Sequence, residues 1–391
     1  MTIDDRPTLT GYRRPSGWGI RNHVLVLPAR TAANLAASRI AAAAPPAVAV
    51  AHEWDDAPGD PDAARVARTL AGFAANPNVG ATLVVGVFPS DRRLADDAAA
   101  RGQRVQFVAL AEHGGTDATV TAAIPMVRDL VGQVAAEVRV PMPVSELILG
   151  LECGGSDAWS GVTANPALGV ASDLLVAAGG TSILAETTEL IGAEHLLAAR
   201  AVDPAVRGRL LEVVHAFEAE LAALGVDIRG AQPAPGNIEG GISTIEEKSL
   251  GSVEKSGAAP LQGVVDFAER PTGRGLHFMD TPGQDIEQMV GMIAGGCQIV
   301  AFTTGRGTPT GSPIAPCVKI GSNSATSARQ AGDIDIDAGP ILEGRETVAT
   351  MGARIYQKLV DVAGGELTVS ERRNQHDFAI SRTLHSPSRI A

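Results

Sequence analysis

The chain has 391 residues, 45% hydrophobic and 19% charged, with 44 glycines and only 3% aromatic residues. This length allows two or three domains with large cores, and the apolar fraction excludes wholesale disorder. The net charge of −12 and the lack of a basic stripe exclude a nucleic-acid surface, so we expect no nucleic-acid partner.

No apolar signal segment follows the start, and no run reaches the roughly 18 consecutive apolar residues of a membrane span. The three cysteines (Cys153, Cys297 and Cys317) are odd in number and widely spaced, which excludes a disulfide framework. These features predict a cytoplasmic protein that does not contact a membrane.

Four apolar runs alternate with helical patterns in the first 140 residues. The runs predict strands at 23–29, 47–53, 81–87 and 104–110. The patterns between them predict helices at 31–44, 61–75, 90–101 and 116–138. Continuous Val and Leu runs between helices are typical of parallel βα units. We therefore expect residues 1–140 to form an N-terminal parallel α/β domain.

The segment "VRVPMPVSE" at 138–146 interrupts this alternation, since Pro141 and Pro143 cannot lie inside a helix. It predicts a domain boundary, with a catalytic α/β domain at 145–375 and a loose tail at 376–391. Within the second domain we expect strands at 147–152, 181–186, 297–304 and 317–322. We expect helices at 165–179, 188–200, 204–224, 283–294 and 345–363, with another from Asn323. Residues 232–257 are rich in glycine and polar groups and predict a long loop. The fold class is α/β, with two Rossmann-like domains and mainly parallel sheets.

Three polar loops follow apolar strands of the second domain. They are "CGGSDAWSGVTANP" (153–166), "ETTELIGAEH" (186–195) and "TTGRGTPTGSP" (303–313). Ligands of open α/β sheets bind beyond the carboxyl ends of the strands. We therefore expect the three loops to line one cleft.

The first loop offers backbone donors and small polar side chains. Gly154 and Gly155 allow a ligand to approach the backbone closely, and Ser156 and Asn165 are candidate substrate contacts. Both polar residues also suit a plain turn and helix cap. That alternative does not explain Cys153, a candidate metal ligand, or Asp157, a candidate catalytic residue.

The second loop holds carboxylates beside a histidine. Glu186 is a candidate metal ligand and His195 a candidate catalytic residue, because a carboxylate–imidazole set suits a divalent cation. Acidic residues in a first helical turn also simply complement the helix dipole, and we favour that interpretation for Glu189.

The third loop places Arg306 between two glycines, where its guanidinium group can hold a carboxylate through two hydrogen bonds. Thr304, Lys319 and Asn323 are candidate substrate contacts at the same or the next strand end. Lys319 could equally be a surface charge. Lys248, in "TIEEKSLG", is a candidate catalytic residue, although a charge run is usually a solvated face.

Four long segments resemble the altronate/galactarate dehydratase family, in the same order and over nearly the whole chain. They are "GYRRPSGWGIRNHVLVLPA", "CGGSDAWSGVTANPALGVASDLLVAAGGTSILAETTELIGAEHLL", "EGGISTIEEKSLGSVEKSG" and "FTTGRGTPTGSPIAPCVKIGSN". Known members are cytoplasmic lyases of sugar acids that typically depend on Fe²⁺ or another divalent metal such as Mn²⁺ or Mg²⁺. The family includes the large subunit of sulfolactate sulfo-lyase.

The resemblance implies a large subunit that binds a small hydroxy acid and works with a separate small subunit of about a hundred residues, the size of one small domain. We also expect a homo-oligomer. Relatives usually carry cysteines after their first three strands, but here these places contain none. The chain therefore has lost that ligand set or uses His52, Glu53, Asp55 or Asp91 instead.

The chemistry that the resemblance implies is metal-assisted β-elimination, in which a sugar acid such as altronate or galactarate loses water and becomes a 2-keto-3-deoxy acid. A divalent metal or a cationic side chain lowers the energy of the intermediate. One alternative is carbon–sulfur cleavage of the sulfolactate type. Another is a non-catalytic subunit of such a complex, suggested by the missing cysteines.

Overall fold

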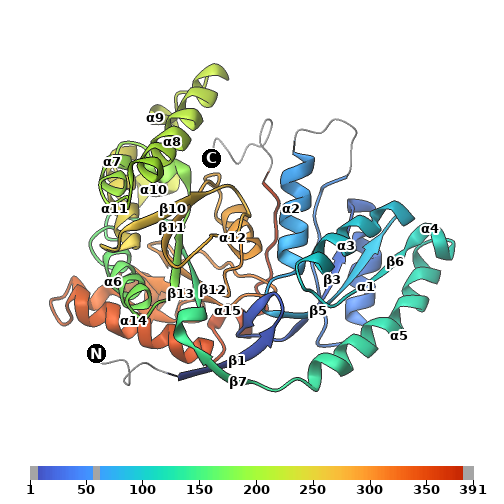
Figure 1. The fold of residues 1–391 in the computed structure, drawn as a ribbon. Coiled ribbons are helices and arrows are strands. Elements are labelled where there is room, and N and C mark those ends of the chain that lie inside the picture. Colours follow the sequence, from blue (N-terminus) through green and yellow to red (C-terminus); the bar gives the residue numbers. More distant parts are fainter. Residues whose placement is uncertain (1–7, 56–61, 382–391) are drawn as a thin grey trace.

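The computed structural model describes residues 8–55 and 62–381, which form two α/β units (Figure 1). Each unit has a parallel sheet, and a small antiparallel sheet lies beside them. The predicted fold class, α/β with Rossmann-like parallel sheets, is confirmed. Among the described residues no helix is long and apolar enough to cross a membrane.

The N-terminal sheet has the strand order β4-β3-β5-β6, with all neighbours parallel. Its strands are β3 (His23–Pro28), β4 (Val48–Ala49), β5 (Val79–Gly86) and β6 (Val105–Ala109). Its helices are α1 (Asn34–Ala42), α2 (Ala63–Ala74), α3 (Arg92–Ala100), α4 (Leu110–His113) and α5 (Thr116–Ala135). The run predicted as a strand at 47–53 contributes only two residues to the sheet. The other three predicted strands form as expected, because their apolar side chains are covered by helices on both faces.

The C-terminal sheet has seven parallel strands in the order β10-β11-β9-β8-β12-β13-β14. They are β8 (Ile148–Cys153), β9 (Thr181–Leu184), β10 (Leu261–Val265), β11 (Gly275–Met279), β12 (Ile299–Thr304), β13 (Cys317–Gly321) and β14 (Ile336–Asp337). The chain leaves β8 toward β9 on one side and reaches β12 on the other. This reversal of strand order creates a crevice at the carboxyl ends of β8 and β12.

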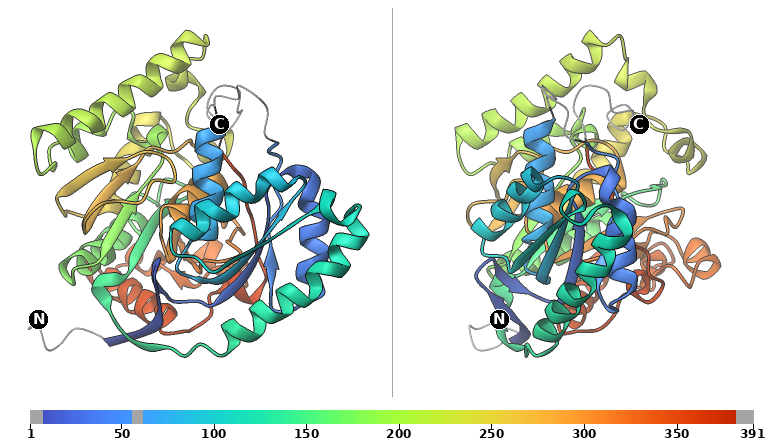
Figure 2. Two further views of the ribbon diagram at one scale, coloured as in Figure 1. Left: turned by 45° about the vertical axis from the view of Figure 1, so that its right-hand side comes forward. Right: turned by 90° about the vertical axis from the view of Figure 1, so that its right-hand side faces the viewer.

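Helices cover both faces of this sheet. The main ones are α6 (Ala164–Ala177), α8 (Pro204–Ala223), α12 (Asp285–Ala294) and α14 (Val348–Ala363). The short ones are α7 (Glu194–Ala198), α9 (Ile228–Ala231), α13 (Ser324–Arg329) and α15 (Val369–Arg372). Helices α6 and α14 pack together on one face, while α12 lies toward the N-terminal unit (Figure 1). Figure 2 shows the long helix α8 at the outer edge of the molecule, where it contacts β10.

The two units share a hydrophobic core. Helix α2 packs against α12, and one cluster joins Phe73 of α2 to Ile293 of α12 and Phe302 of β12. The helices approach so closely at Gly72 that a Cβ there would lie 2.4 Å from the carbonyl oxygen of Ala294. Thus α2 is buried between the two sheets.

The segment predicted as a linker is an edge strand. Strand β7 (Val140–Pro143) pairs antiparallel with β1 (Thr8–Arg14), which also pairs with β2 (Gly17–Gly19). Pro141 and Pro143 are tolerated because an edge strand has one side without a partner. The division into domains at 140 and 145 stays a prediction.

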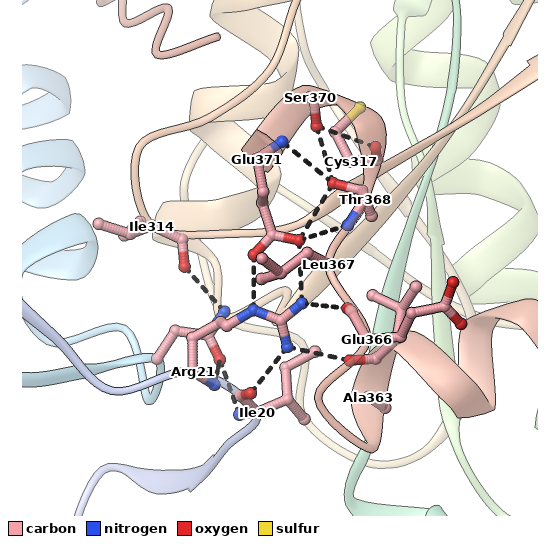
Figure 3. Close-up of polar contacts among 12 residues, drawn as sticks. Ile20, Arg21, Ile314, Cys317, Ala363, Glu366, Leu367, Thr368, Ser370 and Glu371 are labelled. Atoms are coloured by element: carbon pink, nitrogen blue, oxygen red, sulfur yellow. Dashed lines mark hydrogen bonds and ion pairs between the residues drawn. The ribbon is translucent and has the colours of Figure 1, made fainter. Parts of the chain in front are cut away.

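Arg21 joins the start of the chain to its end (Figure 3). Its Nε donates to Glu371 Oε1 at 2.6 Å, and Nη2 donates to Oε2 of the same carboxylate at 2.9 Å. Nη1 donates to the carbonyl of Val362 at 2.9 Å and Nη2 to that of Glu366 at 2.8 Å. This buried guanidinium group therefore fixes the segment after α14 to the residues that precede β3.

One expectation about an irregular segment was wrong. Residues 232–257 form α10 (Pro235–Glu239) and α11 (Ile245–Val253) rather than a loop, and the Thr244 side chain caps α11 by accepting from the Glu247 N–H. The start of the predicted loose tail packs on the shared core, where the ring centroids of Phe378 and Phe73 lie 4.8 Å apart. The remainder of that tail, 382–391, lies outside the described residues.

Candidate functional site

Two adjoining cavities lie at the carboxyl ends of β9, β8 and β12. The smaller, of about 190 Å³, is lined by residues of all three predicted loops, including Gly154, Glu186 and Arg306. The larger, of about 290 Å³, extends toward α11. Cys153, Ser156 and Lys248 line both cavities. The loops that follow three neighbouring strands therefore meet in one cleft.

Asp157 holds the first loop in shape. Its Oδ1 accepts hydrogen bonds from the backbone N–H of Ser160 at 2.9 Å and from the hydroxyls of Ser160 and Ser322 at 2.8 Å. Its Oδ2 accepts from Asn323 Nδ2 at 2.9 Å. These four bonds tie the loop after β8 to the start of α13. This arrangement favours a structural role for Asp157 over the predicted catalytic one.

The glycines of this loop allow other parts of the protein to approach its backbone closely, and their predicted contact with a ligand stays a prediction. A Cβ on Gly154 would lie 1.9 Å from Asp285 Oδ2, so only glycine leaves room for that carboxylate. Gly155 has a φ of 59° and its carbonyl oxygen accepts from the backbone N–H of Arg306 at 3.0 Å. The third loop is thereby attached to the first.

A buried ionic cluster forms one end of the cleft. Lys255 Nζ lies 2.9 Å from Cys153 Sγ and 2.8 Å from Glu189 Oε2. The Ser252 hydroxyl also donates to Glu189. Burial opposes ionisation of Glu189, but Lys255 and Lys248 outweigh it and lower its pKa to about 2. Burial raises the pKa of the Cys153 thiol to about 12, so Cys153 is a neutral thiol here.

Glu186 lies beside this cluster and reaches the smaller cavity. Its Oε1 is 3.5 Å from Lys248 Nζ and accepts from the Thr188 hydroxyl at 2.9 Å, while Oε2 accepts from Gln288 Nε2 at 3.0 Å. Its φ of 77° is unusual for a residue other than glycine, which marks a strained position. Burial and the neighbouring charge of Glu189 raise the pKa of Glu186 to about 7.

Two further carboxyl groups lie nearby. Glu152, the residue before Cys153, is fully buried, and within the described residues neither of its carboxylate oxygens has a hydrogen-bond partner. Burial and the charge of Asp285 raise the pKa of Glu152 well above its usual value. Burial and Glu189 likewise raise the pKa of Asp285. Burial without a partner therefore favours the neutral form of Glu152.

Arg306 forms part of the outer wall of the smaller cavity. Its guanidinium group pairs with Glu239 at 2.9 Å, and 45% of the side chain is exposed. The Nη1 atom of Arg306 lies so close to Gly236 that a Cβ on Gly236 would be only 2.0 Å from it. Asn237 lines the same cavity and donates to the carbonyl oxygen of Ser156 at 3.0 Å.

The other predicted substrate contacts build the framework around the cleft. The Thr304 hydroxyl accepts from the N–H of Gly307 at 2.9 Å, and Asn323 caps α13. Asn165 bridges Thr303 and Gly251, although it also lines the larger cavity. Lys319 is fully buried, donates to the carbonyl oxygen of Thr308 at 2.8 Å and lines neither cavity. Its alternative interpretation as a surface charge is therefore wrong.

The structure does not bring His195 to the cleft. His195 is exposed on α7 and lines neither cavity. The smaller cavity is instead lined by three residues that the sequence analysis did not select: Glu189, Asp285 and Asn237. Lys255, which contacts Glu189, and Glu152 are buried and line neither cavity. The sequence did contain a signal for Lys255. It follows Lys248 by seven residues, a spacing that places both side chains on the same face if the segment is helical throughout.

Comparison with known proteins agrees with this architecture. The family description "D-galactarate/Altronate dehydratase, C-terminal" matches residues 144–386, and "D-galactarate dehydratase/Altronate hydrolase, second domain" matches residues 11–135. The chain belongs to the D-galactarate/altronate dehydratase family.

Curated members of this family include two kinds of lyase. The chain is 36% identical to the (2R)-sulfolactate sulfo-lyase subunit beta of Chromohalobacter salexigens, over 97% of this chain and 98% of that protein. It is 37% identical to the galactarate dehydratase (L-threo-forming) of Escherichia coli, over 79% of this chain and 61% of that enzyme. It is 33% identical to the altronate dehydratase of the same organism, over 95% of this chain and 77% of that enzyme.

The divalent metal expected for this dehydratase family does not fit the donors present. Among residues 8–55 and 62–381, no three His, Cys, Asp or Glu side chains group closely enough to hold a metal ion. The predicted ligands Cys153 and Glu186 contact lysine ammonium groups instead. Asp91, an alternative donor, accepts hydrogen bonds from Arg30 and from the N–H groups of Val87 and Phe88. The metal therefore stays a prediction of the sequence alone.

Proposed function

We propose that the chain is the catalytic subunit of a lyase that removes a β-substituent from a small 2-hydroxy acid. The observation that carries this proposal is the pair of Glu186 and Lys248 at the cavity that Arg306 borders. A carboxylate with a pKa near 7, beside a fixed ammonium group, suits proton removal next to a carboxylate.

In this mechanism Arg306 binds the substrate carboxylate and Glu186 removes the proton from C2. The electron pair of the C–H bond forms the C2–C3 double bond, and the pair of the bond from C3 to its substituent departs with that group. The enol product then becomes a 2-keto acid. Lys248 stabilises the negative charge that develops on the carboxylate, because a cation fixed in place before the reaction needs no reorganisation as that charge forms.

The first candidate substrate is a hydroxylated sugar acid such as altronate or galactarate, which loses water. Hydroxide needs a proton to depart, and the raised pKa of the buried Glu152 carboxyl group, next to Cys153 in the chain, favours Glu152 as its source. Amide groups and backbone donors along the cleft also suit a substrate with several hydroxyls.

The second candidate is a sulfolactate-type substrate, which loses sulfite. The match over 98% of a sulfo-lyase subunit beta favours it, because the galactarate and altronate dehydratases of E. coli match over only 61% and 77% of their length. Sulfite departs without protonation, so this reaction would not need Glu152.

The test is an incubation of the purified chain, with and without a small partner subunit, with galactarate, altronate or (2R)-sulfolactate. Keto acid without sulfite identifies a hydro-lyase, and keto acid with an equal amount of sulfite identifies a carbon–sulfur lyase. The Glu186→Gln variant is the matched inactive control. No keto acid from any of the three, with the partner bound, would refute the proposal and favour a non-catalytic subunit.

A further inference from the structure

Four large apolar side chains are exposed on the segments 158–162, 237–242 and 247–254, which contribute to the lining of the two cavities. They are Trp159, Val162, Ile238 and Leu250, with exposed fractions of 51%, 54%, 57% and 47%. We call them the rim surface. Large apolar side chains gathered on one part of a soluble protein often mark a contact with another protein.

The segments that carry the rim surface are packed against one another. The N–H of Ala158 donates to the carbonyl oxygen of Gly240 at 2.9 Å, which joins the neighbours of Trp159 and Ile238. Gly161 and Gly251 meet closely enough that a Cβ on Gly161 would lie 3.0 Å from the Gly251 Cα. Val162 and Leu250 are the chain neighbours of these glycines and both line the larger cavity. The segments that carry the four side chains are therefore held together by backbone contacts.

This surface lies over the route to the ionic cluster. The same cavity that Val162 and Leu250 line also contacts Cys153 and Lys248. Whatever covers the rim surface would close the larger cavity and exclude water from Lys248. Exclusion of water strengthens the electrostatic effect of an ammonium group.

Acidic side chains border the rim surface. Glu247 and Glu254 are exposed and line the larger cavity. The structure therefore presents an apolar centre with an acidic border. A complementary partner has an apolar centre and a basic border, and its association weakens with salt.

We propose that the rim surface docks the small partner subunit, which covers the larger cavity. This proposal rests on the two-subunit arrangement in the proposed function. Two comparisons favour this occupant. The relative that matches over 98% of its own length is named subunit beta of a lyase, which implies a second subunit. Two altronate dehydratases match over only 77% and 78% of their length, so each contains a further segment that this match does not include. Trp159 is the expected anchor, because tryptophan is enriched among the residues that dominate binding energy.

The experiment measures binding of the purified small subunit to the full chain by calorimetry, without substrate. The probe is the small protein from the same genome that resembles the small domain of altronate dehydratases. We expect Trp159→Ser and Leu250→Ser each to raise the Kd by about tenfold or more. Leu35→Ser, on α1 and 62% exposed, is the matched control and leaves the Kd unchanged. Glu254→Lys and added salt both raise the Kd.

Equal Kd values for Trp159→Ser and the unsubstituted chain, at equal melting temperature, would overturn the docking surface. So would the absence of any binding to the unsubstituted chain. If Trp159→Ser instead dissociates a dimer of this chain in sedimentation, the occupant is a second copy and the proposal is wrong. Binding that depends on Trp159, with no keto acid from any tested substrate, would support the docking surface and refute the proposed reaction separately.

Discussion

Glu186 and Lys248 form a buried ion pair at the floor of the cleft, with 3.5 Å between Oε1 and Nζ and side chains only 4% and 11% exposed. They come from different elements, one after β9 and the other on α11. Their contact places a carboxylate whose pKa is about 7 beside a fixed positive charge.

The first prediction concerns pH. Burial and the charge of Glu189 raise the pKa of Glu186 to about 7, and the base must be ionised to accept a proton. We therefore expect kcat/KM to rise about tenfold per pH unit below pH 7 and to level off above it. Glu186→Gln should lower kcat/KM by roughly 10²- to 10⁴-fold. Glu246→Gln, an exposed change on α11, should keep the wild-type profile. A flat profile across pH 5 to 8 would remove Glu186 as the base.

The second prediction concerns Arg306. Arg306→Lys keeps the charge but loses the paired hydrogen bonds to a carboxylate, so kcat/KM should fall by roughly 10²-fold, or about 2.7 kcal/mol. The melting temperature should barely change, because the Glu239 partner is largely exposed. Glu239→Gln is the control and should keep most activity. Steady-state kinetics beside a melting curve decides, and unchanged kcat/KM for Arg306→Lys would exclude Arg306 from substrate binding.

Removal of Lys255 should be strongly destabilising. Lys255→Met would leave Glu189 buried without its closest cation, which typically costs about 3–5 kcal/mol. Lys358→Met is the matched control, since its ion pair with Glu366 is at the surface. Denaturant unfolding measures both variants. A loss below about 1 kcal/mol for Lys255→Met, the usual size for a surface pair, would contradict the buried ion pair.

The fourth prediction concerns the junction between the start and the end of the chain. Arg21→Lys keeps the charge but cannot serve Glu371 and two backbone carbonyls together, so buried acceptors lose their donors. We expect a loss of about 2–4 kcal/mol in the free energy of unfolding, with a normal Km in any protein that remains folded. Arg372→Lys, close to Glu371 but exposed, should be neutral. Equal stability of Arg21→Lys and wild type would refute the role of this junction.

The fifth prediction concerns metal. Cys153 and Glu186 each contact a lysine ammonium group and do not converge on a common position that a metal ion could occupy. We therefore expect purified protein to carry far less than one Fe²⁺ or Mn²⁺ per chain. Its melting temperature should not respond to a chelator or to added metal. Elemental analysis with melting curves checks this, and one tightly held ion per chain would show that these side chains rearrange around a metal.

Much of the scaffold follows from local sequence signals. The apolar runs of β8 and β12 predict buried parallel strands because both faces of such strands are covered. The polar loops after these strands predict a cleft because parallel strands end at the same edge. Loop chemistry alone also indicated Cys153, Glu186 and Arg306, which do line the smaller cavity.

The rest depended on contacts between distant parts of the chain. Strand β1 pairs locally with β2, but its second partner is β7, at residues 140–143, and no local pattern encodes that distant pairing. Glu189 looked like an ordinary residue of a helical turn, but the 3-10 turn after α11 places Lys255 against it. Asp157 and Asn323 looked like ligand contacts, but they bond to each other across more than 160 positions. Sequence identifies polar groups near a site, whereas tertiary packing decides which of them remain available.

The position of α2 between the two sheets bears on how the chain folds during synthesis. When the N-terminal unit leaves the ribosome, Phe73 and the side of α2 that contains Gly72 are uncovered. Their partners on α12 are synthesised much later. That apolar surface stays open to wrong contacts until Asp285–Ala294 emerges. A nascent chain stalled before α12 is therefore a natural client for a chaperone, whereas one that has reached Phe378 contains every segment of this core.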